Sequence, residues 1–244
     1  MADTKKRRMV GAIVVLIGAI LLIVAAFTPW YTESFSATVF GSKITINANS
    51  YPGFPNSNGT IQYTCSGLPT GASCLSSTSY QNSHLNNTGN IAEAGYFMTI
   101  VGFILGLIGA IMGMMSRNNA RRAGPAFALA IVAMILALAA FGLFAAALPG
   151  AIGSDTPGHT GTGPWSSFFG STNTTGFGIP VAGTLTWGPA VGWYLAIVAF
   201  VVLLIGAFLI MRNRKDPEPA AMPAPSTPTT AAPSGTPPMS PPSS

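Results

Sequence analysis

The sequence predicts an α-helical membrane protein: a four-transmembrane-helix bundle with a small, disulfide-braced antiparallel β-sheet in its first extracellular loop. Three observations support this fold class. Only 7% of the 244 residues are charged, whereas a soluble domain carries about a quarter. Four stretches of about twenty residues contain no Asp, Glu, Lys, Arg or His. The basic residues flank these stretches almost entirely on one side of the predicted membrane.

The four apolar stretches are residues 9–28, 94–115, 126–148 and 189–211. At about 1.5 Å per residue, a helix of this length crosses a hydrocarbon core of about 30 Å. Each stretch should be a continuous helix, because lipid cannot satisfy free backbone polar groups. The first stretch also resembles a secretory signal with Val24-Ala25-Ala26 as the cleavage site, but its apolar run is longer than a signal core. An uncleaved anchor is therefore favoured.

Basic residues set the orientation. Ten of the eleven lie in residues 1–8, 116–125 and 212–244, and only Lys43 lies elsewhere. The positive-inside rule places these three segments in the cytoplasm and the loops 29–93 and 149–188 outside a cell (plasma) membrane. The net charge of +5 is thus a topology signal. A nucleic-acid partner is disfavoured, because the spans separate the charges that would have to share one binding face.

The first outer loop, residues 29–93, should be rich in β structure. Residues 34–40 and 43–47 are strand-like, and Gly41-Ser42 between them is a two-residue hairpin signal. A second hairpin is predicted from residues 60–65 through a turn at 68–71 to residues 73–75. Its two sides carry the only cysteines of the chain, Cys65 and Cys74. In an oxidising exterior we expect these two to form a disulfide.

The outer loops also contain candidate modification and contact residues. Three acceptor patterns for N-glycosylation begin at Asn58, Asn86 and Asn173. In the second loop, the aromatic residues Trp165, Phe168 and Phe169 are grouped. They either fold back onto the first loop or present an apolar contact to a partner. Four other aromatic residues are expected to anchor the chain at the membrane borders: Trp30, Trp187, Trp193 and Tyr194.

The membrane stretches favour close helix packing and disfavour transport. The second contains overlapping GxxxG patterns formed by Gly102, Gly106, Gly109 and Gly113, and the third is rich in Ala. No ionisable residue lies in any stretch, although pumps and ion-coupled carriers need such groups at membrane depth. We find no pattern for a catalytic, cofactor-binding or metal site, and His84 and His159 are isolated in the outer loops. We therefore expect no enzyme, no cofactor and no metal.

The last segment, residues 216–244, holds ten of the twenty prolines, mixed with Ala, Ser and Thr. Such a composition cannot bury a core and predicts a disordered cytoplasmic tail. Two PxxP patterns occur in it, but this spacing arises readily in proline-rich sequence, and a spacer is the default interpretation.

Several of these features together resemble the claudin-like tetraspan superfamily, which includes claudins, epithelial membrane proteins and peripheral myelin proteins. Phe27-Thr28-Pro29-Trp30-Tyr31 is similar to the Pro/Trp element that ends the first span of that family. The spacing of Cys65 and Cys74 is similar to that of its first-loop disulfide hairpin, and residues 187–194 resemble the beginning of its fourth span. The resemblance implies a four-span fold with a sheet outside. The proline-rich tail is more typical of a microbial relative.

Two functional hypotheses remain open. The first is a non-enzymatic structural or interaction protein that uses its outer loops to contact other membrane proteins, or itself as a homo-oligomer, on the cell surface or within the bilayer. The alternative is an accessory subunit of a larger oxidase, transporter or secretion complex, which would dock through its small-residue helix faces. A pore of paracellular type is a third option.

Overall fold

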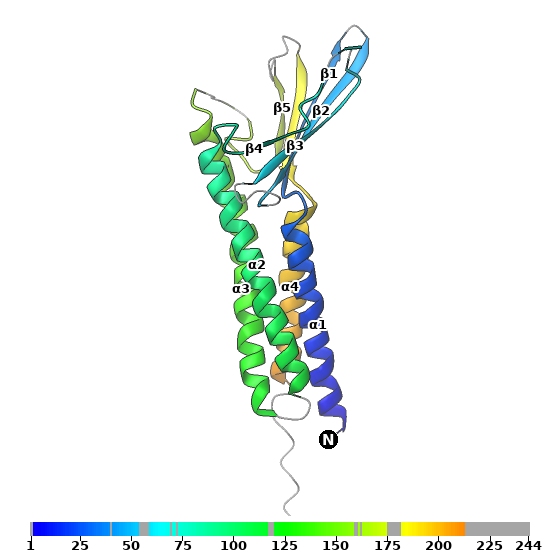
Figure 1. The fold of residues 1–244 in the computed structure, drawn as a ribbon, viewed down its shortest axis with the longest axis vertical. Helices are drawn as coiled ribbons and strands as arrows, with labels where there is room; N and C mark the ends of the chain where they lie inside the picture. The colour runs from blue at the N-terminus through cyan, green and yellow to red at the C-terminus, as the bar shows by residue number, and fades with distance from the viewer. Residues whose placement is uncertain are drawn as a thin grey trace, which may run out of the picture.

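The computed structural model describes residues 2–39, 41–53, 59–68, 70–71, 73–116, 120–158, 161, 163–174 and 182–212. The acceptor Asn58 and the proline-rich tail from residue 213 onward lie outside the described residues. The helices form a bundle at one end of the molecule, and a β-sheet stands on the other end (Figure 1).

Four helices are long and apolar enough to cross a membrane: α1 (Ala2–Ala26), α2 (Asn86–Met115), α3 (Ala123–Asp155) and α4 (Val191–Arg212). A short 3-10 helix, η1 (Ala120–Arg122), precedes α3. In the bundle, α1 packs against α2 and α4, and α3 packs against the same two helices. The prediction of four long apolar helices is thus confirmed.

Small side chains predominate inside the bundle, together with buried Leu22, Leu203 and Ile210, whereas large apolar side chains cover its outside. Buried alanines recur along α3, at Ala126, Ala130, Ala133, Ala137 and Ala140. In contrast, the exposed positions carry large apolar side chains, for example Ile104 and Ile108 on α2 and Phe208 on α4. This arrangement lets the helix backbones approach closely and turns an apolar surface outward, as is typical of helices surrounded by lipid.

At the ends next to the sheet, two helices extend beyond the apolar stretches identified in the sequence. The second begins at Asn86 and the third continues through Pro149 to Asp155. At about 1.5 Å per residue, the 33 residues of α3 span about 50 Å, more than a hydrocarbon core requires. The outer turns of both helices therefore reach the level of the sheet, as Figure 1 shows.

The sheet has six antiparallel strands in the order β4-β3-β2-β1-β6-β5. The first loop supplies β1 (Tyr31–Val39), β2 (Ser42–Tyr51), β3 (Thr60–Ser66) and β4 (Ser77–Ser79). The second loop supplies β5 (Gly170–Thr174) and β6 (Gly183–Pro189), with β6 paired to β1. The antiparallel sheet in the first loop is confirmed, whereas its extension by the second loop was not predicted.

Two details of the predicted hairpins are wrong. Ser42 pairs with Val39 and belongs to β2 rather than to the turn, because the ladder continues to the very end of β1. Residues 73–75 are not a strand. The partner of β3 is instead β4, whose Ser79 pairs with Thr60. The strand paired to β3 thus begins at Ser77, four residues later than the predicted start at residue 73.

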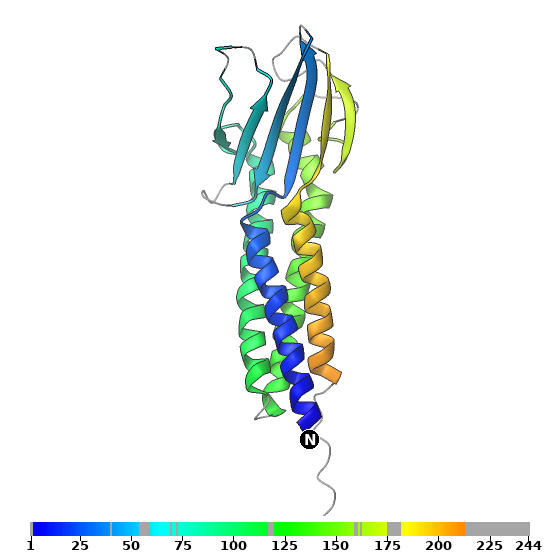
Figure 2. The ribbon, with the colours of Figure 1, turned by 90° about the vertical axis from the view of Figure 1, so that its right-hand side faces the viewer.

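The sheet continues directly from the first and last helices, as Figure 2 shows. Trp30 links α1 to β1, and its backbone carbonyl accepts a hydrogen bond from Ala190 N at 2.9 Å, just before α4. Its indole Nε1 donates to Ala25 O at 2.7 Å, and its ring packs edge-on against Phe144 with centroids 5.2 Å apart. The side chain is completely buried. Trp30 is therefore part of the core.

The expectation of an interfacial ring is also wrong for Trp187, which is buried within the sheet. Trp187 is paired with Glu33 in the β1–β6 ladder, and the alternation of strand residues turns its ring toward the helices. Trp30 precedes β1 and is buried instead by its contacts with the helix ends, as described above. Of the four aromatic residues named as border anchors, only Tyr194 is largely exposed.

Candidate functional site

The strongest candidate site lies between the sheet and the outer ends of α2 and α3. It arises from the alternation along β1, where Tyr31, Glu33, Phe35 and Ala37 occupy the face directed at the helices. Three of these four positions are apolar or aromatic and buried. Glu33 is the exception, since it places a carboxyl on the inner face of the sheet.

Glu33 lines a cavity of about 200 Å³. The other polar residues around it are Tyr31, Ser50, Tyr63, Tyr80 and Thr88. The apolar part of the lining consists of Ala48, Ile61, Leu85, Leu148 and Ile152. These side chains come from β1, β2, β3, the turn after β4 and the outer turns of α2 and α3. The cavity therefore exists only when the sheet is docked on the bundle.

The cavity shifts the titration of its ionisable groups. Burial raises the pKa of Glu33 from its ordinary value of 4.5 to about 7, because low polarity disfavours the charged carboxylate. Burial also raises the pKa of Tyr31 and of Tyr63, with the nearby Glu33 adding to both effects. The pKa of Tyr80 is raised by burial too, against a hydrogen bond from Ser50 that lowers it.

Two hydroxyls of the lining, those of Tyr31 and Thr88, have no hydrogen-bond partner among the described residues. Tyr31 is 2% exposed, and its hydroxyl has no hydrogen-bond partner within the described part of the chain. Its ring lies 5.8 Å from that of Phe168, centroid to centroid. A buried hydroxyl without a partner costs about 1–3 kcal/mol. Such a group in a cavity wall is a natural contact for a guest molecule.

The lining can exchange a proton or hold a charge, but it lacks the groups of a metal centre. Across the described residues, no three His, Cys, Asp or Glu side chains come close enough to share a metal ion. The cavity holds one carboxyl and three phenols and no Lys, Arg or His. Its chemistry is therefore that of an uncharged or anionic hydrogen-bonding site, according to the protonation of Glu33.

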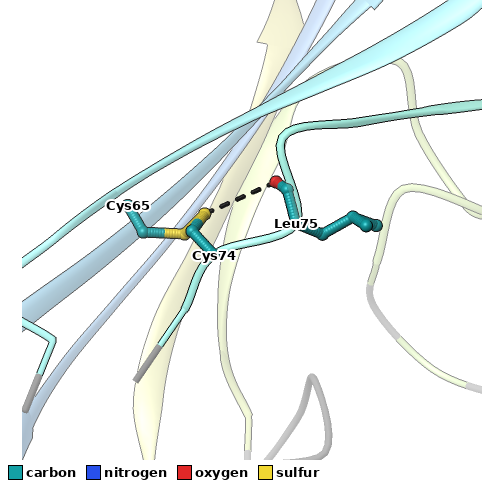
Figure 3. The surroundings of a disulfide bond; sticks show 3 residues. All are labelled: Cys65, Cys74 and Leu75. Carbon is teal, nitrogen blue, oxygen red and sulfur yellow. Dashed lines mark hydrogen bonds between the residues drawn. A yellow bond between two sulfur atoms is a disulfide. The ribbon is translucent and has the colours of Figure 1, made fainter. Parts of the chain in front are cut away.

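The predicted disulfide is confirmed. Cys65 on β3 and Cys74 in the segment before β4 are bonded, with their Cα atoms 6.0 Å apart. Figure 3 shows the bridge beside Leu75. It joins the segment that leads to β4 to a strand that is already paired on its other side, and thus restrains the edge of the sheet.

The three aromatic residues grouped in the second loop differ in their exposure. Phe168 packs against the core, with its ring centroid 5.4 Å from that of Trp193 and 6.1 Å from that of Phe144. Trp165 is half-buried next to Gly153 of α3. In contrast, Phe169 is 72% exposed. Phe168 thus folds back onto the core and the first loop, whereas Phe169 stays on the surface, and its contact with a partner remains a prediction.

Two of the glycosylation acceptors are described. Asn86 is the exposed first residue of α2, but Thr88 of its tripeptide is buried. Asn173 is exposed on β5, where its Oδ1 accepts a hydrogen bond from Thr184.

The four glycines of the second span are all buried inside the bundle. A Cβ added at Gly102, Gly106 or Gly113 would meet side chains of α1, at 3.2, 3.1 and 2.9 Å respectively. At Gly109 it would instead meet Leu129 of α3 at 3.2 Å. These glycines let α2 approach two neighbouring helices of the same chain.

Sequence reasoning missed Glu33 as a site residue. The signal that could have found it is the period-two pattern of residues 31–37, which places this carboxyl in register with Tyr31, Phe35 and Ala37. The sequence matches no protein-family model and no curated protein. The site must therefore be interpreted from its own geometry.

Proposed function

We propose that the protein is a non-enzymatic, multi-pass protein of the cell membrane that contacts other proteins, or copies of itself, through the outer face of its sheet. Its termini lie in the cytoplasm in this proposal, in keeping with the distribution of basic residues. The observation that carries the proposal is the exposed aromatic side chain of Phe169 beside rows of uncharged polar side chains, with Lys43 at the end of the same face.

The outer face of the sheet is built from hydroxyl and amide side chains. One row crosses five strands in register, through Thr64, Asn47, Ser34, Thr186 and Ser171. A second row lies two residues further along β1 and consists of Ser66, Thr45, Ser36, Thr184 and Asn173. Neither row contains a charge. Such a surface can make many hydrogen bonds with a partner without the desolvation cost of buried ions.

Phe169 adds an apolar anchor to this surface. A Cβ added at Gly188, which shares the outer face with Thr184 and Thr186, would lie 3.3 Å from Phe169 Cβ. The ring therefore stands on the outer face, at the start of β5. Aromatic anchors within a polar surround account for much of the energy of protein interfaces. This combination supports a role in protein contact.

The bundle gives less support to the accessory-subunit alternative. That hypothesis needs small-residue helix faces on the outside, but Gly102, Gly106, Gly109 and Gly113 are covered by neighbouring helices of the same chain. The outer surface of the bundle instead carries large apolar side chains such as Ile104 and Phe208. Lipid is the partner that such a surface suits best.

We also propose a distant relationship to the claudin-like tetraspans. It is supported by the Pro29-Trp30 link between the first helix and the sheet, and by the disulfide of the first loop. The exterior contact proposed above does not depend on this relationship, because fold alone does not fix function.

Purification in a mild detergent tests the proposal. We expect Phe169→Ser to lose the co-purifying partner or the homo-oligomer, by about tenfold or more. Leu75→Ser is the matched control, since Leu75 is another exposed apolar side chain of the exterior, at 62% exposure. If Phe169→Ser keeps every partner while Phe208→Ala on the outer surface of α4 loses them, the accessory-subunit hypothesis replaces this one.

A further inference from the structure

We propose that the cavity lined by Glu33 and three tyrosines binds a small organic cation, namely an ammonium ion carrying alkyl groups. The site goes beyond the proposed protein contact. It lies on the opposite face of the sheet from Phe169 and its polar surround, and it requires no protein partner.

Charge selects a cation. Glu33 is the only residue of the lining that becomes charged near neutral pH, and no Lys, Arg or His lines the cavity. The nearest titratable side chains on the packed elements are Tyr31 on β1, Tyr63 on β3 and Tyr80 after β4. The helices contribute Thr88, Leu148 and Ile152, which carry no charge. A guest ammonium would therefore meet one carboxylate and no opposing charge.

The Asp155 carboxylate is already engaged in hydrogen bonds, so we do not expect it to compete with Glu33 for the guest. It accepts hydrogen bonds from the backbone N–H groups of Asn87 and Thr88 at 3.0 and 2.7 Å, and it does not line the cavity. Among the described residues, Glu33 is consequently the carboxyl that lines the cavity.

The rest of the lining selects alkyl groups over a bare ion. The three tyrosines supply phenol rings, and a cation near an aromatic ring gains about 0.5–2 kcal/mol. Ala48, Ile61, Leu85, Leu148 and Ile152 supply apolar contact. A metal ion would need several more oxygen, nitrogen or sulfur ligands than one carboxyl supplies.

Size limits the guest. The volume of about 200 Å³ is below the roughly 300–1,000 Å³ that is typical of pockets for drug-sized ligands. It suits an ion of the size of tetramethylammonium or choline. The unpartnered hydroxyl of Tyr31 would gain a hydrogen-bond acceptor if the guest carries an oxygen, as choline does.

The experiment is calorimetric titration of the purified full-length chain, held in a maltoside detergent, with tetramethylammonium and with choline. We expect binding of both at pH 8. The neutral choline analogue 3,3-dimethyl-1-butanol should bind about tenfold more weakly or worse, because it keeps the shape and lacks the charge. Equal binding of the neutral analogue would overturn the proposal, as would no binding of either cation at pH 8.

Two carboxyl variants locate the site. Glu33→Gln should weaken binding by about tenfold or more, since one lost charge-assisted contact commonly has this effect. Glu93→Gln, which removes a half-buried outer carboxyl that does not line the cavity, should bind like the wild type. If Glu93→Gln loses as much affinity as Glu33→Gln, the cation binds elsewhere and the proposal fails.

Acidity provides a second readout. Binding should weaken by about tenfold for each pH unit below the pKa of Glu33, because a protonated carboxyl offers no charge to the guest. In Glu33→Gln the residual binding should not depend on pH between 5 and 8. A wild-type affinity that is constant over this range would contradict the role of Glu33.

A choline group can also belong to a lipid, and nanodiscs distinguish the two sources. In phosphatidylglycerol nanodiscs, whose lipid has no choline headgroup, added choline should bind to the protein whether the natural guest is a lipid headgroup or a free ion. If the headgroup occupies the cavity, phosphatidylcholine nanodiscs should suppress that binding. If free ions are the guests, the two nanodiscs should give the same affinity. Absence of choline binding in phosphatidylglycerol nanodiscs would count against the site itself.

Discussion

The carboxylate of Asp155, the last residue of α3, accepts a 2.7 Å hydrogen bond from the backbone N–H of Thr88 in the first turn of α2. Its other oxygen accepts hydrogen bonds from the backbone and side-chain nitrogens of Asn87. The N-cap residue of α2, Leu85, has no side chain that can satisfy these N–H groups. One helix thus supplies the cap of another, and the cap fixes the two outer ends together.

Replacing this cap should loosen the start of α2. We expect Asp155→Ala to lower the stability of the first turn by about 1 kcal/mol, because two backbone N–H groups lose their acceptor. Hydrogen exchange at Asn87 and Thr88 measures the effect directly. Ser154→Ala is the control, since that hydroxyl bonds only to Gly150 O of its own helix. Unchanged protection of α2 in Asp155→Ala would argue against the cap.

Stability should fall as pH rises from about 4.5 to about 7, because of Glu33. Below about pH 4.5 its carboxyl is protonated in both the folded and the unfolded chain, and the full stability is present. Between pH 4.5 and its folded-state pKa of about 7, the Glu33 carboxyl ionises in the unfolded chain but stays protonated in the folded chain. This difference costs about 3 kcal/mol by pH 8. Urea unfolding of the β-sheet and its connecting loops, without added ligand, measures this loss of stability.

Glu33→Gln should remove that dependence. The amide cannot ionise, so we expect the variant to be more stable than the wild type at pH 8 and similar to it at pH 4. Glu93→Gln should keep the wild-type profile. A Glu33→Gln variant that is less stable at pH 8 would mean that the carboxylate has a stabilising partner in solution.

Loss of the disulfide should destabilise the exterior and leave the bundle folded. We expect Cys65→Ser or Cys74→Ser to cost the outer domain about 2–3 kcal/mol, because the cross-link restricts the unfolded chain. Native protein should not react with maleimide until it is reduced, since both sulfurs are bonded. Helix content by circular dichroism should be unchanged in both variants. Full labelling of unreduced protein would speak against the bond.

Two glycine variants should separate internal packing from the bundle surface. A Cβ at Gly106 would lie 3.1 Å from Ala19 Cβ of α1, whereas one at Gly142 would meet nothing within 4 Å. We expect Gly106→Leu to destabilise the bundle by about 2 kcal/mol or more through overpacking. Gly142→Leu should be close to neutral. Thermal unfolding in detergent compares the two. Equal tolerance of both would show that α1 and α2 are not closely packed.

The orientation of the chain can be tested by labelling introduced cysteines in intact cells. Ser171 on β5 and Arg121 in η1 are both exposed and lie at opposite ends of the molecule. A membrane-impermeant maleimide should label Ser171→Cys, and Arg121→Cys should react only after permeabilisation, as the distribution of basic residues predicts. Ser116, at the same end of the molecule as Arg121, is unsuitable because it is buried. The reverse labelling would invert the topology.

Local patterns were enough to predict some of these features. The four long helices follow from runs of apolar residues, and the disulfide follows from two cysteines in one strand-rich loop. The burial of Trp30 could not be predicted in the same way, because its position next to an apolar run also suits a membrane border. Its partners, Phe144 and Gly192, are supplied by helices far along the chain.

The cavity could not be predicted from the sequence for the same reason. The position of Glu33 on the inner face depends on the pairing of β1 with both β2 and β6. The second loop is rich in Gly, Ser and Thr, and such a composition alone indicates no strand. Only the alternation in Thr184-Leu185-Thr186-Trp187 carried the information that this segment could join a half-buried sheet.

The pairing of β1 with β6 also determines when the sheet can form during synthesis of the chain. Thr186 donates a hydrogen bond to the carbonyl oxygen of Ser34, 152 residues earlier in the chain. While the ribosome makes the intervening residues, over about 10–30 s at usual rates of synthesis, the edge of β1 has no neighbour on that side. An open edge of this kind is prone to wrong pairing. A chain that stops after α3 should therefore leave the edge of β1 unpaired and exposed, and the sheet can be completed only once β6 has been made.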